Sequence, residues 1–165
     1  MMGAMLYTRV DSPIGELLLV GDGRALHGLS MLDGPRPPRI ATAWERSDTC
    51  FAPVRRQLDE YFAGGRPAFE LPLTMAGAPF DQRVWEELRR IPYGETISYG
   101  ELARRIGHLS AARAVGVANG RNPISVIVPC HRVIGADGSL TGYGGGLERK
   151  RFLLELEAGV LTLTP

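Results

Sequence analysis

The sequence predicts an α/β N-terminal domain, a small antiparallel sheet covered by a helix, followed by a mostly α-helical domain that contains a helix-turn-helix. Short apolar segments separated by turn residues occupy the first third of the 165-residue chain, and apolar residues at helical spacing dominate the second half. Between them, residues 66–79 carry three prolines and no helical period, which is typical of an edge strand that runs into an interdomain linker. We therefore expect domains at residues 1–78 and 79–165.

Three strands and one helix are expected in the N-terminal domain. Residues 6–10 alternate between apolar and polar side chains, and residues 16–20 and 25–32 flank a Gly-Asp-Gly turn that is a strong hairpin signal. Apolar residues then recur at helical spacing over residues 51–62, until two glycines end the run. These segments predict an antiparallel meander with one amphipathic helix against it.

Three helices are expected at the start of the second domain. Apolar residues recur at helical spacing over residues 80–91, where Asp81 can cap the start. A Ser-Tyr-Gly-Glu capping box opens a second helix over residues 98–106, and Ser110 can cap a third helix over residues 111–119. Because a tight glycine-containing turn joins the second and third helices, they form a predicted helix-turn-helix.

The predicted helix at 111–119 is rich in alanine and glycine and carries one long side chain, Arg113. A helix so poor in bulky side chains can approach another surface closely, either a neighbouring helix or a partner outside the protein. Its place as the second helix of a helix-turn-helix favours the outside partner. The segment from Arg89 to Arg132 holds seven arginines against two glutamates, which hints at a polyanion, although charge alone favours a solvated surface.

Composition excludes several classes of protein. The hydrophobic fraction of 44% is that of a globular chain, so wholesale disorder is excluded, and no apolar stretch approaches the roughly 18 residues of a membrane span. The first residues lack the features of a signal peptide, so we expect a cytoplasmic protein. The two cysteines, Cys50 and Cys130, do not make a disulfide framework, and with the three histidines they show no zinc-binding spacing. Cys50, near the start of a helix, favours a buried structural thiol.

Cys130 and His131 form the strongest chemical signal in the chain. The apolar residues 125–128 predict a buried strand that ends at this pair. A thiolate is the reactive form of cysteine, and a neighbouring base raises its population, so the pair is a candidate activated nucleophile. A buried core cysteine beside a surface histidine stays the alternative.

Glu157 is the candidate third member of this group. In the predicted C-terminal helix it shares a face with Leu153 and Leu154, so its carboxylate points at the core and needs a partner there. His131 would complete a Cys–His–Glu relay. An exposed or arginine-paired Glu157 is equally compatible with the helical period.

Residues 79–165 resemble the O6-alkylguanine-DNA alkyltransferases, which are methylated-DNA–protein-cysteine methyltransferases. The resemblance rests on three segments, ISYGELA, ARAVGVANGRNP and VIVPCHRVIG, and extends less distinctively over the N-terminal half. It implies a ribonuclease H-like N-terminal domain and a winged helix-turn-helix C-terminal domain. It also implies DNA repair in which an alkyl group moves from guanine O6 to the protein's own cysteine in one irreversible turnover, with no cofactor and no metal.

The resemblance implies a role for each catalytic candidate. Cys130 would accept the alkyl group, His131 would remove its proton, and Glu157 would orient the histidine. Asn122 would be the hinge between the recognition helix and the active-site loop. Tyr99 would crowd the phosphate beside the target and promote rotation of the base.

The resemblance also implies how DNA is held. Arg113 would replace the flipped guanine in the base stack, from a helix that enters the minor groove of double-stranded DNA containing O6-alkylguanine. The further expected DNA contacts are Tyr99, Ala112, Ala114, Gly116, Asn119 and Arg121. The expected alkylguanine pocket is formed by Pro129, Val133, Tyr143 and Gly144. We expect a monomer with no membrane partner, and whether copies cooperate on DNA stays open.

Three other functions were weighed against this one. A protein that binds alkylated bases without chemistry would lack the acceptor cysteine, which this chain retains at Cys130. A winged-helix DNA-binding regulator does not account for the apolar segment leading into Cys-His. A cysteine hydrolase needs an oxyanion hole and a substrate cleft, and the sequence signals neither.

Overall fold

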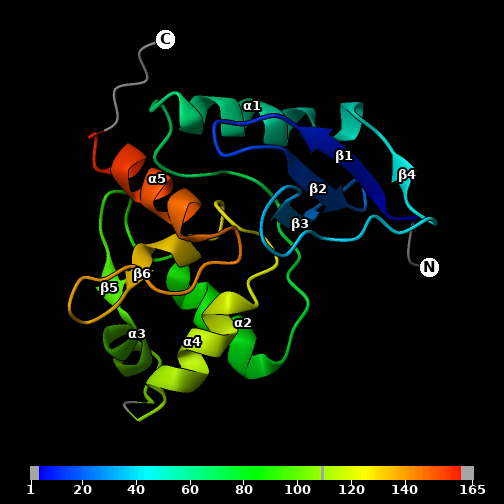
Figure 1. Cartoon of the computed structure of the whole chain (residues 1–165). Helices are drawn as coiled ribbons and strands as arrows, with labels where there is room; N and C mark the ends of the chain where they lie inside the picture. The colour runs from blue at the N-terminus through cyan, green and yellow to red at the C-terminus, as the bar shows by residue number, and fades with distance from the viewer. Residues whose placement is uncertain (1–3, 109, 161–165) are drawn as a thin grey trace.

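The computed structural model describes residues 4–108 and 110–160 of the chain. A small sheet covered by a helix forms the N-terminal part, and a group of short helices forms the remainder (Figure 1). The fold class predicted from the sequence is confirmed by this arrangement.

The sheet has four strands in the order β3-β2-β1-β4. They are β1 (Leu6–Val10), β2 (Leu17–Gly21), β3 (Leu26–Met31) and β4 (Glu45–Arg46). The first three form the predicted antiparallel meander, with Val10 of β1 opposite Leu17 of β2. The fourth strand pairs parallel to β1, so the sheet is mixed rather than antiparallel. The long segment between β3 and β4 carries the chain to the far edge of the sheet, which a tight hairpin cannot do.

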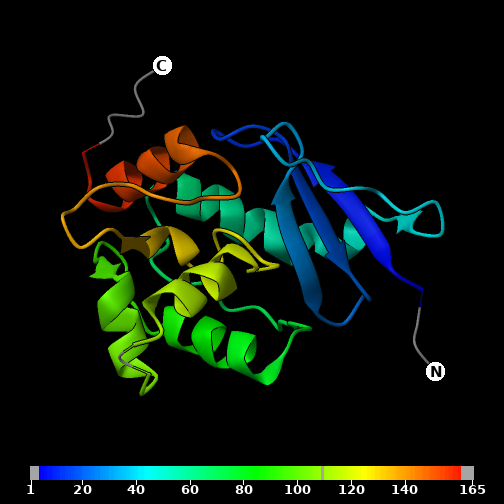
Figure 2. The same cartoon turned by 60° about the horizontal axis from the view of Figure 1, so that its bottom comes forward.

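Helix α1 (Ala52–Phe62) covers one face of the sheet, after a short 3₁₀ turn, η1 (Thr49–Phe51) (Figures 1 and 2). Its buried residues Val54, Leu58, Tyr61 and Phe62 recur three and four positions apart, as the sequence predicted. Gly64 then adopts a φ of 81°, which L-residues rarely adopt, and the helix ends there. The C-terminal end of α1 consequently lies beside the last helix of the chain (Figure 1).

The expected edge strand within residues 66–79 is reduced to a single bridge, in which Leu73 pairs with Leu26 of β3. The prolines of this segment lack the N–H that a ladder needs, so pairing cannot extend. Further along the same edge of β3, the N–H of Leu29 donates to the carbonyl of Pro123 at 2.9 Å. The sheet therefore contacts directly the loop that precedes Cys130.

The C-terminal part consists of short helices around a two-stranded parallel sheet. Its elements are α2 (Pro79–Leu88), β5 (Ile97–Ser98), α3 (Tyr99–Arg105), α4 (Ala112–Gly120), η2 (Cys130–Arg132), β6 (Val133–Ile134) and α5 (Leu147–Glu157). Helices α3 and α4 form the predicted helix-turn-helix and pack on α2, where Trp85 donates its indole N–H to the Ala118 carbonyl at 2.9 Å. No helix in the described part of the chain has the length and apolar character needed to cross a membrane.

Two of the three predicted helix caps are wrong. Ser98 does cap α3, since its hydroxyl accepts the backbone N–H of Glu101 at 3.0 Å. Helix α2, however, begins after Ala78, so Asp81 lies in the first turn and is buried. Helix α4 begins after Ala111 with no side-chain cap, so Ser110 lies outside it. Helix α2 thus starts three positions before, and helix α4 one position after, the start that its expected cap implied.

Candidate active site

Asn122 closes the loop that joins α4 to Cys130. Its side-chain amide donates to the carbonyl of Val128 at 2.8 Å, and its side-chain oxygen accepts the N–H of Ile124 at 3.0 Å. Residues 125–128 therefore form a tight turn, and the buried strand predicted there is wrong. Val126 adopts a φ of 72° within it, which costs a β-branched residue energy and requires a well-held loop.

Cys130 begins the 3₁₀ turn η2, and its side chain is 5% exposed. The backbone on both sides of the thiol is fixed: the N–H of Cys130 donates to Val128, and the Asn119 amide donates to the Cys130 carbonyl at 3.3 Å. Burial raises the pKa of the Cys130 thiol, while the Asn122 amide and the Lys150 charge act in the opposite direction. The resting thiol is therefore protonated, and a reaction at sulfur needs a base.

His131 is fully buried and stands in a defined orientation. Its Nε2 lies 2.7 Å from Oε2 of Glu157. Because a carboxylate only accepts hydrogen bonds, Nε2 carries the proton and Nδ1 carries the lone pair. Nδ1 has no hydrogen-bond partner among the described residues, and burial lowers the pKa of His131 despite the opposing pull of Glu157. The imidazole is thus a neutral base with an unoccupied acceptor nitrogen.

Glu157 receives hydrogen bonds from three side chains at once. Besides His131, the hydroxyl of Tyr61 lies 2.5 Å from Oε2, and Arg132 binds both carboxylate oxygens, at 2.7 Å through Nε and at 3.0 Å through Nη2. Burial alone would raise the pKa of Glu157, but the hydrogen bonds from His131 and Arg132 prevail and hold it at about 2. The sequence left open whether Glu157 faces a histidine or an arginine, and it faces both.

Lys150 was not identified from the sequence, yet it supports the loop of residues 135–146, between β6 and α5, which we call the Lys150-supported loop. Its buried ammonium group donates to the carbonyls of Val133 at 2.6 Å, Thr141 at 2.7 Å and Gly142 at 3.4 Å. Burial lowers the pKa of Lys150 to about 8, against the opposing influence of Cys130. The signal that could have found it is simple: the chain has 19 basic residues, and this is the only lysine.

A cavity of about 200 Å³ opens beside Cys130. Its lining comes from strand β3 and the segment after it, from α4 and the loop that joins α4 to Cys130, and from the Lys150-supported loop. The lining residues are Ser30, Met31, Arg36, Asn119, Gly120, Asn122, Ser125, Cys130, Gly142, Tyr143, Gly144 and Gly145. Oδ1 of Asn119 and the hydroxyl of Tyr143 are buried there without partners among the described residues. Burial raises the pKa of Tyr143 well above its ordinary value, so its hydroxyl stays protonated. Polar groups left unpaired in a cavity are available to a ligand.

Two of the four expected pocket residues lie elsewhere. Tyr143 and Gly144 line the cavity, but Val133 is fully buried with its carbonyl taken by Lys150. Pro129 lines a separate cavity of about 210 Å³, together with Tyr93. Pro129 and Cys130 are adjacent yet line different cavities, so adjacency in sequence did not imply a shared pocket.

Helix α4 exposes the small residues and the arginine that the sequence singled out. Arg113 and Ala114 are exposed, Ala112 and Gly116 are half-buried, and Val117, which was not expected there, is 49% exposed. Asn119 departs from its expected place among the DNA contacts, because it is buried and faces Cys130. Arg121 is exposed and lies 3.6 Å from Asp81.

Tyr99 lies between α4 and the Lys150-supported loop. Its hydroxyl donates to the Thr141 carbonyl at 3.0 Å, and the Lys150 ammonium lies 5.9 Å from its ring centroid. A Cβ atom at Gly116 would be 3.6 Å from the ring. The half-buried tyrosine therefore joins the exposed helix to the mouth of the cavity.

Known proteins share both the sequence and the fold of this chain. The profile described as "6-O-methylguanine DNA methyltransferase, ribonuclease-like domain" matches residues 5–75, and the corresponding "DNA binding domain" profile matches residues 79–159. The methylated-DNA–protein-cysteine methyltransferase of Mycobacterium tuberculosis (strain ATCC 25618 / H37Rv) is 56% identical over 151 residues, which cover 92% of this chain and 91% of the relative. This chain belongs to the methylated-DNA–protein-cysteine methyltransferase family.

Two further relatives agree with this membership. The methylated-DNA–protein-cysteine methyltransferase of Methanosarcina acetivorans is 48% identical over 153 residues, 93% of this chain and 98% of the relative. The crystal structure of Mycobacterium tuberculosis OGT in complex with DNA superposes with a TM-score of 0.89 at 52% identity, covering 96% of each chain. The methyltransferase fold is thus shared over nearly the whole length.

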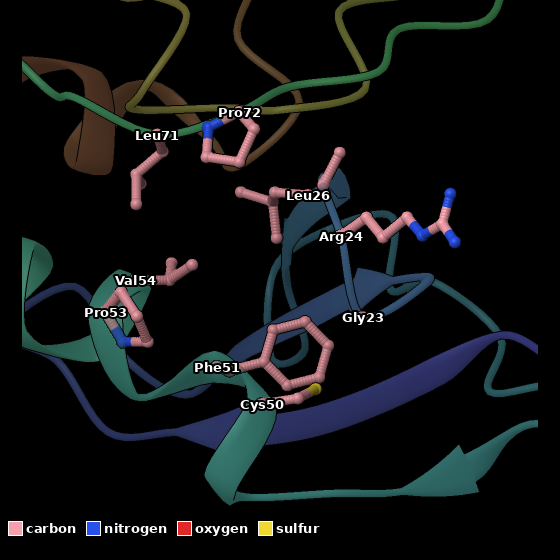
Figure 3. Close-up of a pocket in the computed structure, with 10 residues that line it drawn as sticks. Gly23, Arg24, Leu26, Cys50, Phe51, Pro53, Val54, Leu71 and Pro72 are labelled. Atoms are coloured by element: carbon pink, nitrogen blue, oxygen red, sulfur yellow. The ribbon is translucent and has the colours of Figure 1, made fainter.

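The other cysteine of this methyltransferase has no comparable surroundings. Cys50 is half-buried rather than buried as expected, and it lies in the wall of a different cavity, of about 150 Å³, between α1 and the β2–β3 turn (Figure 3). Apolar residues dominate this cavity, and no histidine or carboxylate lines it. Arg24, its charged lining residue, points away from the sulfur (Figure 3). His131 directly follows Cys130 in the sequence, whereas no histidine adjoins Cys50 or lines its cavity.

The arginine-rich segment of this methyltransferase is largely neutralised within the structure. Six of its seven arginines contact a carboxylate: Arg89, Arg90, Arg104, Arg105, Arg121 and Arg132. Arg113 is the exception within residues 4–108 and 110–160, since it has no ion pair or hydrogen bond there. The side chain expected to enter DNA is therefore also the one that no acidic residue holds.

Proposed function

We propose that this methyltransferase repairs O6-alkylguanine in duplex DNA by moving the alkyl group onto Cys130. Family membership gives the activity, methyl transfer from methylated DNA to a cysteine of the protein. One observation carries the choice of cysteine. His131, the residue after Cys130, is held by Glu157 at 2.7 Å and its Nδ1 has no partner among the described residues, whereas no histidine adjoins Cys50 or lines its cavity.

The proposed transfer is a direct displacement at the alkyl carbon. The thiol proton of Cys130 passes to Nδ1 of His131, through a water molecule, and leaves a thiolate. The sulfur attacks the alkyl carbon and the S–C bond forms as the C–O6 bond breaks. The departing guanine takes up one proton, which balances the proton that His131 removed from the thiol. Tyr143, whose hydroxyl stays protonated in the cavity, is suited to donate a hydrogen bond to the purine.

The same geometry supports base flipping through helix α4. An alkyl carbon inside the duplex is out of reach, so the base must leave the stack at a cost of a few kcal/mol. Arg113 is exposed, unpaired within the described residues, and flanked by the small side chains of Ala112 and Ala114, which fits close approach to the minor groove. Tyr99, between this helix and the cavity, is placed to contact the phosphate beside the target.

One chain contributes every group named in this reaction, and we propose that the protein acts as a monomer. Because its substrate is DNA, we propose that the protein works in the compartment that contains the DNA. The thioether formed at sulfur has no good leaving group, so we propose that each molecule reacts once.

Titration with duplex DNA containing O6-methylguanine tests this function. Repaired guanine should reach a plateau near one equivalent per protein, and Cys130→Ser should give none while still binding DNA. Cys50→Ser is the matched control and should reach the same plateau as the unaltered protein. Continued repair beyond one equivalent, or a full plateau with Cys130→Ser, would contradict the proposal.

A further inference from the structure

Tyr61 connects the N-terminal domain to the reaction centre. It lies in the last turn of α1, 96 residues from Glu157 in sequence, and its hydroxyl is 2.5 Å from Oε2 of that carboxylate. The side chain is fully buried. The same carboxylate oxygen accepts the hydrogen bond from Nε2 of His131 at 2.7 Å.

Packing alone does not explain the hydroxyl of Tyr61. The ring lies 5.2 Å from that of Phe62, 5.3 Å from Phe69 and 6.2 Å from Tyr93, measured between centroids. A phenylalanine would fill this aromatic space without a polar atom. A buried hydroxyl is tolerated only with a partner, and here the partner is the carboxylate beside the reaction's base.

Unlike Arg132, the phenol of Tyr61 carries no charge, and unlike His131 it takes no proton from the thiol in the proposed reaction. Burial and the adjacent carboxylate both raise the pKa of Tyr61. Its hydroxyl therefore stays protonated and donates a hydrogen bond throughout the working pH range. A donor on Oε2 fixes the direction of that oxygen and withdraws part of its negative charge. Both effects are felt by His131, which shares the oxygen.

We propose that Tyr61 is a positioning residue for the transfer reaction: its hydroxyl holds Oε2 of Glu157 against His131 and limits how strongly the carboxylate attracts the imidazole proton. This inference rests on the proposed function, in which His131 removes the proton of Cys130. It gives the N-terminal domain a direct part in the chemistry, because α1 supplies a group to the relay.

Tyr61→Phe in the full-length protein tests this role, with free O6-benzylguanine as the alkyl donor. The free base needs no flipping, so its rate reports the chemistry rather than DNA handling. Tyr7→Phe is the matched control, because it removes a tyrosine hydroxyl from the same domain, in β1, where the ring faces Trp44. Thermal unfolding of both variants accompanies the rates and identifies any loss of folding.

Losing the phenol should slow the reaction at neutral pH by roughly 5-fold or more, the scale of one hydrogen bond to a charged group. The acid limb of the pH–rate profile should also shift to higher pH, by about 0.5 to 1 pH unit. Without the hydrogen bond from Tyr61, the Glu157 carboxylate attracts the His131 proton more strongly and raises the pKa of His131. The titratable and charged groups that act on His131 and Glu157 are Tyr61, Tyr93, Arg132, Tyr143 and Lys150. Only the first is altered in the test.

A double-variant cycle separates a route through Glu157 from a general effect of packing. In a Glu157→Gln background, Tyr61→Phe should change the rate less than about 2-fold, because its partner is already altered. An unchanged rate and acid limb for the single variant would overturn the inference, and so would independent, multiplying effects in the cycle. If the unaltered protein failed to alkylate Cys130 at all, the proposed function itself would fail, which is a distinct result.

Discussion

The ammonium group of Lys150 lies 2.6 Å from the carbonyl oxygen of Val133, inside the protein and away from any carboxylate partner among the described residues. Two more carbonyls, of Thr141 and Gly142, share the same ammonium. A compact group with three donors satisfies three converging carbonyls, whereas the planar guanidinium of arginine does not fit them. This lysine therefore fixes the loop that carries Tyr143 over the cavity.

Lys150→Met should destabilise the protein by about 1–3 kcal/mol, because several buried carbonyls lose their donor. It should also slow reaction with O6-benzylguanine, since the loop bearing Tyr143 loses its support. Lys150→Arg should not restore the rate. Denaturant unfolding and rate measurements on both variants check this, with the exposed Arg151→Met on the same helix as control. A normal rate in Lys150→Met would show that the loop is held by other contacts.

Glu157 should make the stability of the protein depend on acid. Its folded pKa of about 2 lies below the ordinary 4.5, so its contribution is complete above about pH 4.5 and is lost as pH falls through 2. A difference of this size corresponds to roughly 3 kcal/mol. Unfolding free energies measured from pH 6 downward should fall less steeply in Glu157→Gln than in the unaltered protein. Glu148→Gln, an exposed change on the same helix, should leave the slope unaltered.

Arg113→Ala should slow transfer from duplex DNA while leaving reaction with free O6-benzylguanine intact. The lost contribution is that of filling the vacated stack, a few kcal/mol at most. A mismatched target should recover part of the rate, because its base costs less to extrude. Arg55→Ala, on the exposed side of α1, is the control. Weaker DNA binding with an unchanged duplex rate at saturation would make Arg113 an ordinary phosphate contact.

Local sequence patterns predicted the elements of the fold better than their connections. Alternation identified β1, the hairpin turn signal identified β2 and β3, and helical spacing identified α1. The parallel pairing of β4 has no such signature, since two residues carry no period. The apolar run at 125–128 satisfies a strand pattern equally well as a turn, and only the side-chain bonds of Asn122 decide between them.

The candidate site divides in the same way. Cys130 and His131 are adjacent, and Glu157 was found from the helical face that it occupies. A local sequence pattern therefore identified each of them. No local pattern identified Tyr61 as part of the site, because its spacing in α1 is that of any core residue and its partner is 96 positions away. Periodicity shows which side chain is buried, but it does not show which distant polar group it meets.

Locating the transferred group tests the account most directly. The protein is mixed with duplex DNA containing O6-methylguanine, digested, and the peptides carrying Cys50 and Cys130 are compared by mass spectrometry. The account predicts one added methyl group on the Cys130 peptide and none on the Cys50 peptide. A methyl group on Cys50, or none on either cysteine after the DNA has been repaired, would contradict it.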